Sequence, residues 1–163
     1  MKTLLIVWHS LTGGTAQMAE AAAHAGGTQE DVQIRRLRAP AAGPEDVLAA
    51  DGYLFATPEN LAAMAGLMKD FFERCYYPAL GRTEGRPYAS LVCAGTDGTG
   101  AARQIARIAT GWRLREIAPP VIIRTGAQTP ETILAPKHLA TAALAPCAEL
   151  GQAMAAGLAM GIF

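Results

Sequence analysis

Residues 2–15 read KTLLIVWHSLTGGT. The first half, Lys2 to Trp8, is a continuous apolar run of the kind that forms a strand buried on both faces of a parallel sheet. The second half contains the polar, glycine-rich loop Ser10-Leu11-Thr12-Gly13-Gly14-Thr15, and an alanine-rich helical pattern follows it from about Ala16 to Ala25. This succession of strand, short polar loop and helix predicts the first unit of an α/β domain.

The same alternation continues along the rest of the chain. Strands are expected at residues 32–37, 52–56, 88–94 and 120–124, and helices at residues 45–49, 61–72, about 99–114 and from about 139. Alternation at this spacing implies a single doubly wound α/β domain over residues 1–163. Its five-stranded parallel sheet would have right-handed crossovers and helices on both faces.

The composition excludes several classes of function. Hydrophobic residues make up 51% of the chain and charged residues 17%, and the formal net charge is zero, so nothing points to a nucleic acid partner. No signal peptide and no membrane insertion are expected, because the apolar start is short and the alanine-rich residues 139–163 are interrupted by proline, glycine and glutamate. Three cysteines, an odd number without a secretion signal, indicate buried reduced thiols and a cytoplasmic location.

Three polar loops are expected to meet at one edge of the sheet. The loops Ser10–Thr15, Thr57–Leu61 and Ala94–Gly100 each follow a predicted buried strand. Open α/β sheets bind ligands beyond the carboxyl ends of their strands, where the strand order reverses. The coincidence of three such loops therefore predicts a ligand site at this edge.

The first loop has the composition of a phosphate site. The hydroxyls of Ser10, Thr12 and Thr15 and the free N–H groups of a helix start can donate to a phosphate, while Gly13 and Gly14 let the backbone wrap around it. The loop contains no Lys or Arg, so we expect neutral donors around a monophosphate rather than a nucleoside triphosphate with magnesium. The alternative is a helix-capping turn in which the glycines serve geometry alone.

Ser10, Thr12, Gly13 and Thr15 match the phosphate-loop pattern Ser/Thr-x-Thr-Gly-x-Thr, and here the chain resembles the flavodoxin-like superfamily. Residues 56–71 look like the third-strand loop and the helix after it in the NAD(P)H quinone reductase and NADPH-dependent FMN reductase branch, and residues 94–100 look like the second flavin loop of that branch. The resemblance implies a flavodoxin-like three-layer sandwich with strand order 2-1-3-4-5. It also implies FMN, with its phosphate on the first loop and its isoalloxazine ring against the other two, and NAD(P)H as a transient electron donor.

The FMN-binding residues expected from this resemblance lie in the three loops. They are Ser10, Leu11, Thr12, Gly13, Gly14, Thr15, Thr57, Pro58, Glu59, Asn60, Leu61, Ala94, Gly95, Thr96, Asp97, Gly98 and Gly100. Asn60 could read the polar edge of the ring, and the third loop could place backbone donors where negative charge develops on reduction. For Glu59, the simplest role is a carboxylate at a helix N-terminus, favoured by the helix dipole.

Two observations favour a reductase over an electron carrier. Neither of the two ring loops contains an aromatic residue, which leaves a ring face open for a nicotinamide or a quinone, and the chain lacks the acidity of the carriers. No Ser-His-Asp or Cys-His set and no metal-ligand spacing can be placed at the pocket, so the flavin would carry the chemistry.

We therefore expect an FMN-dependent NAD(P)H oxidoreductase that passes electrons to a quinone or a similar small acceptor. An electron carrier without its own substrate and a domain that has lost its flavin are the alternatives. A homodimer could form through residues 64–77, although core packing explains the same apolar stripe.

Overall fold

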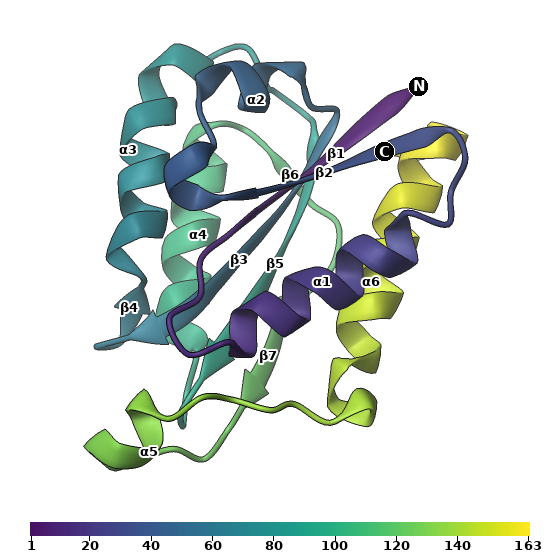
Figure 1. Ribbon diagram of the computed structural model, residues 1–163. Coiled ribbons are helices and arrows are strands. Elements are labelled where there is room, and N and C mark those ends of the chain that lie inside the picture. Colours follow the sequence, from purple (N-terminus) through teal and green to yellow (C-terminus); the bar gives the residue numbers. More distant parts are fainter.

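The computed structural model describes residues 1–163 and contains one sheet with helices on both of its faces (Figure 1). The strands are β1 (Lys2–Trp8), β2 (Val32–Arg38), β3 (Gly52–Asn60), β4 (Ala63–Met64), β5 (Pro87–Ala94), β6 (Arg115–Glu116) and β7 (Val121–Arg124). Their order is β2-β1-β3-β5-β6, with β4 paired to β3 and β7 paired to β5. All pairs are parallel except β3 with β4, which confirms the parallel α/β architecture.

The expected sheet of five strands in the order 2-1-3-4-5 is wrong in its count, because the sheet has seven strands. Its fifth position is shared by β6, which pairs with Pro87 and Tyr88, and β7, which pairs with residues 91–94. Pro119 and Pro120 lie between these two strands. Since proline has no N–H to donate, the hydrogen bonding to β5 is interrupted there, and the fifth sheet position consists of two short strands.

Residues 60–64 form a tight hairpin where the sequence predicted the start of a helix. β3 ends at Asn60, the chain turns at Leu61 and Ala62, which have φ values of 51° and 63°, and it returns as the short antiparallel β4. The helix that follows, α3 (Gly66–Ala79), therefore begins later than the apolar spacing indicated. The hairpin keeps the end of β3 at the carboxyl edge of the sheet.

The helices α1 (Gly14–Gly26) and α6 (Thr141–Met160) share a core with one face of the sheet, and α2 (Pro44–Ala49), α3 and α4 (Thr99–Gly111) share a core with the other (Figure 1). On the first of these faces, α1 packs against α6. The shorter helices are η1 (Ala39–Ala41), before α2, and α5 (Pro130–Leu134), at the carboxyl edge. No helix combines the length and the apolar character needed to cross a bilayer.

Each face of the sheet has its own hydrophobic core, because successive side chains of a strand point to opposite faces. In β1, Leu5 and Val7 belong to the core under α3 and α4, and Leu4 and Ile6 belong to the core under α1 and α6. All four side chains are fully buried, as the continuous apolar run predicted.

The apolar stripe of α3 lies in the first of these cores. It consists of Met68, Phe71, Phe72 and Cys75, which are at most 1% exposed. Core packing therefore explains the stripe, and a homodimer stays a prediction. All three cysteines are buried and form no disulfide, as the sequence indicated.

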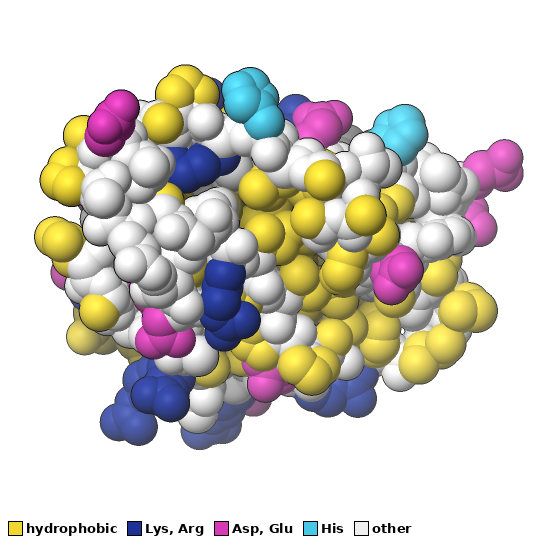
Figure 2. Space-filling model, turned by 90° about the horizontal axis from the view of Figure 1, so that it is seen from below, with side chains coloured by type: hydrophobic (Ala, Val, Ile, Leu, Met, Phe, Trp, Pro, Cys, Tyr) yellow, Lys and Arg dark blue, Asp and Glu magenta, His cyan; other side chains and the backbone are white.

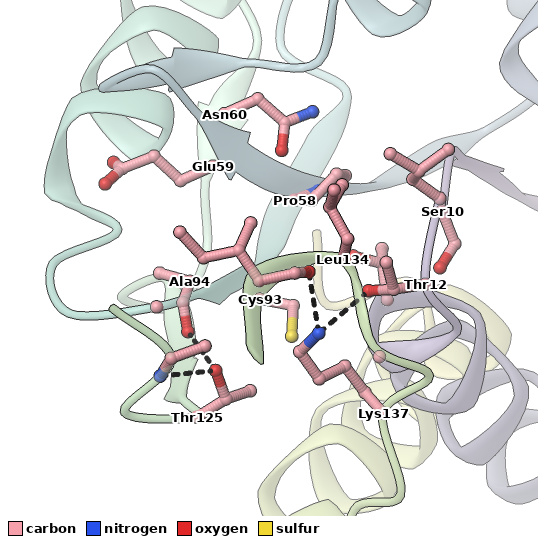
Figure 3. Close-up of a pocket in the computed structure, with 16 residues that line it drawn as sticks. Ser10, Thr12, Pro58, Glu59, Asn60, Cys93, Ala94, Thr125, Leu134 and Lys137 are labelled. Atoms are coloured by element: carbon pink, nitrogen blue, oxygen red, sulfur yellow. Dashed lines mark hydrogen bonds between the residues drawn. The ribbon is translucent and has the colours of Figure 1, made fainter. Parts of the chain in front are cut away.

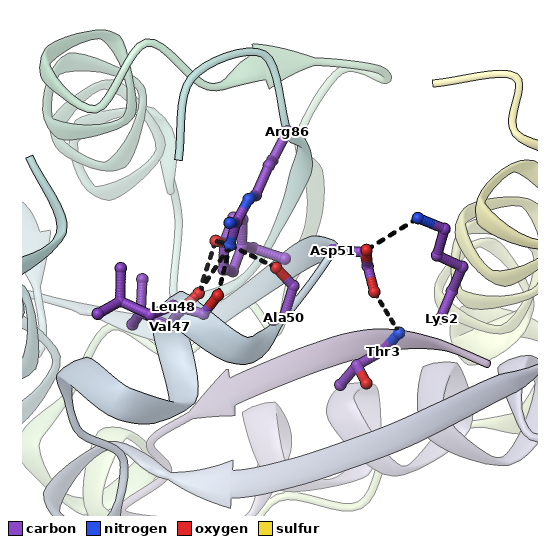
Figure 4. Close-up of polar contacts among 8 residues, drawn as sticks. Lys2, Thr3, Val47, Leu48, Ala50, Asp51 and Arg86 are labelled. Atoms are coloured by element: carbon purple, nitrogen blue, oxygen red, sulfur yellow. Dashed lines mark hydrogen bonds and ion pairs between the residues drawn. The ribbon is translucent and has the colours of Figure 1, made fainter. Parts of the chain in front are cut away.

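Arg86 fixes the opposite, amino edge of the sheet (Figure 4). Its Nη1 donates to the carbonyl oxygens of Leu48 at 2.9 Å and Ala50 at 2.6 Å, and to the hydroxyl of Tyr53 at 3.0 Å. These carbonyls belong to the end of α2, where a helix leaves its last acceptors unpaired.

Asp51 joins the same edge to the start of β1 (Figure 4). It accepts hydrogen bonds from the N–H of Thr3 at 2.8 Å and from Nζ of Lys2 at 3.0 Å. The amino ends of β1 and β3 are thereby held together, far from the loops at the carboxyl edge.

Candidate functional site

Loops from four strands surround one cavity at the carboxyl edge of the sheet. The last residues of β3 and β5 and residues that follow β1, β5 and β7 line it, including part of the segment between β7 and α6 (Figure 3). We call this segment, residues 125–140, the strap; it includes α5 and runs across the strand ends in Figure 1. Figure 2 views the molecule from this side and shows hydrophobic side chains gathered across the middle of the face, with Lys and Arg side chains within it and along its border.

Most of the residues predicted from the sequence line this cavity. These are Ser10, Leu11, Thr12, Gly14, Thr15, Pro58, Glu59, Asn60, Ala94 and Gly95. The predicted residues outside the lining are Gly13, Thr57, Leu61, Thr96, Asp97, Gly98 and Gly100. The structure thus brings together the first loop and the beginnings of the other two, while the role of each residue toward a ligand stays a prediction.

Gly13 and Ser10 shape the first loop. Gly13 has a φ of 99°, in the left-handed region that favours glycine, and its N–H donates to Ser10 Oγ at 3.0 Å. Gly13 is also the N-cap of α1, and no side chain caps this helix. The N–H groups of its first turn are therefore available to a ligand, and the partial positive charge of the helix start favours an anion.

Thr15 and Gly14 complete a cradle that fits a phosphate. Thr15 is 1% exposed, and its hydroxyl is a buried polar atom without a hydrogen-bond partner. Leaving such a group unpaired costs about 1–3 kcal/mol, which a ligand acceptor would offset. A Cβ on Gly14 would lie 2.5 Å from Sγ of Cys93, so only glycine lets the loop pack this closely against β5.

Lys137, on the strap, brings a positive charge to this loop. Its Nζ lies 3.4 Å from Thr12 Oγ1 (Figure 3). The same Nζ donates to the carbonyl oxygens of Ile133 at 2.8 Å and Ala135 at 2.5 Å. The loop itself contains only neutral donors, as its sequence shows, and Lys137 adds an ammonium from a remote segment. No local sequence signal indicates this contact, because Thr12 and Lys137 are 125 residues apart.

Gln17 clamps the strap to the first loop. Its Nε2 donates to the carbonyl oxygens of Gly13 at 2.9 Å and Lys137 at 2.7 Å, and its Oε1 accepts from the N–H of Leu139 at 2.9 Å. The N–H of Lys137 also donates to the carbonyl oxygen of Thr12 at 2.7 Å. The main chain at Lys137 and Leu139 is thus tied to the first loop and to α1, independently of the lysine side chain.

The second loop reaches the cavity through Pro58, Glu59 and Asn60. Thr57 is buried and has an internal role: its Oγ1 accepts from the N–H of Ala65 at 3.0 Å and donates to the carbonyl oxygen of Pro58 at 2.9 Å. Leu61 stands at the tip of the hairpin with a fully exposed side chain. The cavity is therefore lined by the residues before the turn, and Leu61 at its tip points into solvent.

Glu59 connects the second loop to the third. Its Oε1 accepts from the N–H of Gly98 at 2.9 Å, and its Oε2 accepts from the N–H of Ala101 at 3.1 Å. A carboxylate at a helix N-terminus was the simplest expectation for Glu59. It does take that role, but at α4 across the edge of the sheet and not at α3, which follows it in the chain.

The third loop contributes only its first two residues, Ala94 and Gly95, to the cavity. Residues 96–100 turn away into the start of α4, where Thr99 donates its hydroxyl and N–H to Asp97 and so lowers the pKa of that carboxyl. The strap covers the loop from outside: the N–H of Gly126 donates to the carbonyl oxygen of Gly95 at 2.8 Å.

Several lining residues were missed by the sequence reasoning. They are Cys93, Thr125, Ala127, Ile133, Leu134 and Lys137. A signal existed for Thr125 and Ala127, since they follow the last predicted strand and the same edge rule applies to them. Ile133 and Leu134 belong to α5, which the sequence pattern did not reveal.

The chemistry of the lining is that of a binding site without its own catalyst. None of its residues is aromatic, in agreement with the bare loops of the sequence. Burial raises the pKa of Cys93 in spite of the nearby Lys137, so this thiol stays protonated at neutral pH. The cavity offers hydroxyls, N–H groups and one ammonium, a donor set suited to a phosphorylated ligand.

Comparisons with known proteins agree on the class of this domain. The sequence profile of the family described as NADPH-dependent FMN reductase matches residues 9–126. A flavodoxin of Aquifex aeolicus is 30% identical over 100 residues, which cover 61% of this chain and 54% of that protein. An NAD(P)H dehydrogenase (quinone) of Acidithiobacillus ferrooxidans is 32% identical over 94 residues, which cover 45% of this chain and 47% of that protein.

The chain thus spans about half the length of these two curated relatives. Among solved structures, a flavodoxin from the domain Archaea superposes with a TM-score of 0.76 at 16% identity, covering 96% of this chain and 98% of that one. At this identity the likeness shows the fold, which is flavodoxin-like.

Proposed function

The chain belongs to the NADPH-dependent FMN reductase family, and from this premise we propose that it binds FMN at the carboxyl edge of its sheet and works as an NAD(P)H-dependent oxidoreductase. The proposed acceptor is a quinone or a similar small molecule, on the strength of the Acidithiobacillus relative's name. The observation that carries the proposal is the hydroxyl of Thr15, which is buried without a partner at the uncapped start of α1.

The phosphate of FMN would be held by the first loop. Its donors are the N–H groups of the first turn of α1 and the hydroxyls of Thr12 and Thr15, while Ser10 already accepts from Gly13 and braces the turn. Hydrogen bonds to a charged acceptor contribute about 1.5–3 kcal/mol each, so a few such donors suffice for tight binding.

The ring of FMN would lie toward the second and third loops. Pro58 stiffens the end of β3, and Glu59 ties that end to the start of α4, so the backbone around the cavity is held in place before a ligand arrives. Ile133 and Leu134 of the strap would shield part of the cavity from water. FMN itself supplies the hydride and electron chemistry, which no side chain of this lining offers.

NAD(P)H and the acceptor would bind in turn over the cofactor. The chain contains no separate dinucleotide fingerprint, and the lining has no aromatic side chain that would cover the ring. The buried thiols, which form no disulfide, support a reducing compartment such as the cytoplasm for this activity.

The test is to load the purified chain with FMN and mix it, without oxygen, with NADH or NADPH. We expect at least one of the two to bleach the flavin absorption, and added quinone to restore it. A flavin that stays oxidised with both donors would remove the reductase proposal.

A second candidate is an electron carrier of the flavodoxin type, favoured by the Aquifex relative and the archaeal structure. It would bind FMN in the same cavity and react only with protein partners. A holoprotein that does not react with NADH or NADPH, but is reduced by a ferredoxin or flavodoxin reductase, would establish the carrier instead.

A further inference from the structure

Lys137 is a lysine without an acidic partner. Of the three lysines of the chain, Lys2 pairs with Asp51 at 3.0 Å and Lys69 pairs with Glu73 at 3.8 Å, whereas Lys137 forms no ion pair. Its ammonium is partly buried at the wall of the cavity and is held there by main-chain oxygens. A charge placed in this way lacks the counterion that an anionic ligand would supply.

One of the three hydrogen bonds of Lys137 is long, and it is the one directed at Thr12 in the cavity lining. An ammonium has three donors, and two of them are used by the carbonyl oxygens of Ile133 and Ala135 in the strap. The third faces Thr12 Oγ1 at 3.4 Å, which is a long contact (Figure 3). If the Thr12 hydroxyl accepts from the ammonium, its own hydrogen is free to be donated onward into the cavity.

The position of this ammonium is built into the fold. The N–H of Lys137 donates to the carbonyl oxygen of Thr12, and its carbonyl oxygen accepts from Gln17. Both contacts involve the main chain and belong to the same clamp that fixes the start of α1. Across the same loop, the buried and unpartnered hydroxyl of Thr15 marks where an acceptor is missing.

We propose that Lys137 is the charged ligand of the FMN phosphate and makes the chain prefer FMN over riboflavin, which lacks the phosphate. This inference rests on the proposed function, and it assigns the charge to a strap residue remote in sequence from the phosphate loop. Neutral donors alone would bind a phosphate, but the ammonium adds a charge-assisted contact in a partly water-excluded place. The strap thereby becomes part of the cofactor site.

The test compares the two flavins on the full chain after its flavin has been removed. FMN and riboflavin are titrated by fluorescence quenching into the unaltered chain and into Lys137→Met, Lys137→Arg and Lys69→Met. Lys137→Met keeps much of the side-chain length and removes the charge. Lys69→Met removes the same charge from α3, outside the cavity lining, and is the matched control.

We expect Lys137→Met to raise the Kd for FMN about 10- to 100-fold and to change the Kd for riboflavin by less than about twofold. Lys137→Arg should recover most of the FMN affinity, and Lys69→Met should leave both affinities unchanged. Because the strap is also clamped through its main-chain atoms, the thermal midpoint of the flavin-free protein should change only slightly in the variants.

Two results would overturn the inference. An unchanged Kd for FMN in Lys137→Met would show that the ammonium does not reach the phosphate. Equal losses for FMN and riboflavin would show that Lys137 only supports the strap. If the unaltered chain binds neither flavin, the proposed function fails first, and this outcome is distinct from both.

Discussion

Thr15→Val should have opposite effects on the flavin-free chain and on the FMN complex. Valine has nearly the shape of threonine but cannot form the hydrogen bonds of its hydroxyl. Thr15 is 1% exposed and its hydroxyl has no hydrogen-bond partner within the protein, which costs about 1–3 kcal/mol. Its removal should therefore raise the free energy of unfolding by about 1–2 kcal/mol, or the Tm by roughly 2–8 °C for a domain of this size.

In the FMN complex, Thr15→Val should weaken the binding of FMN. A hydrogen bond from Thr15 to a charged phosphate contributes about 1.5–3 kcal/mol, so Thr15→Val should raise the Kd for FMN by about 10- to 150-fold. Urea unfolding of the flavin-free chain and a fluorescence titration with FMN measure the two effects separately. Thr110→Val, on the exposed side of α4, is the control and should change neither.

The reasoning on Thr15 is refuted by either of two results. Lower stability of the flavin-free Thr15→Val chain would mean that the hydroxyl has a partner in solution. Unchanged affinity for FMN would mean that the phosphate does not reach the start of α1.

Three other perturbations test separate parts of the structure. Thr12→Val should weaken FMN binding by about 1–3 kcal/mol, because the phosphate loses a hydroxyl donor; a normal flavin titration would place the phosphate elsewhere. Glu59→Ala should lower the free energy of unfolding by about 1–3 kcal/mol in urea, because Gly98 and Ala101 lose their carboxylate acceptor, and Glu59→Gln should lose less; equal losses would contradict this role. For Asp51, burial opposes ionisation, but the N–H of Thr3 and the ammonium of Lys2 outweigh it and lower the pKa below its ordinary value. The stabilising contribution of Asp51 is therefore complete above about pH 4 and is lost as the pH falls through the lowered pKa. Asp51→Asn should flatten the dependence of Tm on pH in that acid range. An unaltered pH profile of Tm would count against the contact.

The sequence was sufficient to predict the central strands of the sheet, because these strands are buried on both faces. β1 has the bounds that the apolar run from Lys2 to Trp8 predicted, and β5 differs from its prediction by one residue. A two-faced core leaves a continuous signal of this kind in the sequence. The carboxyl-edge rule then placed the three loops correctly relative to one another.

The hairpin after β3 could not be predicted in the same way. Met64 lies at helical spacing from Met68 and Phe71, so the apolar pattern extended the helix backward through the turn. The turn itself uses Leu61 and Ala62 with positive φ, a conformation that these residue types rarely adopt. Tertiary contacts hold it: the N–H of Met64 donates to Gln104 on α4 at 2.8 Å.

The strap could not be predicted from the sequence for a different reason. Its short helix α5 has no buried residue and therefore leaves no hydrophobic periodicity in the sequence. Lys137 reaches the loop Ser10–Thr15 only because Gln17 and Thr12 bind the strap backbone. Contacts between segments so far apart in the chain follow from the folded structure and not from any local motif.

The central claim is that the cavity at the carboxyl edge binds FMN through the loop Ser10–Thr15. The most direct test is the visible absorption spectrum of the purified chain, before and after addition of FMN and removal of the excess. Our account predicts flavin bands that stay with the protein, and that are weakened in Thr15→Val at limiting FMN. A spectrum without flavin bands, and no uptake of added FMN, would contradict it.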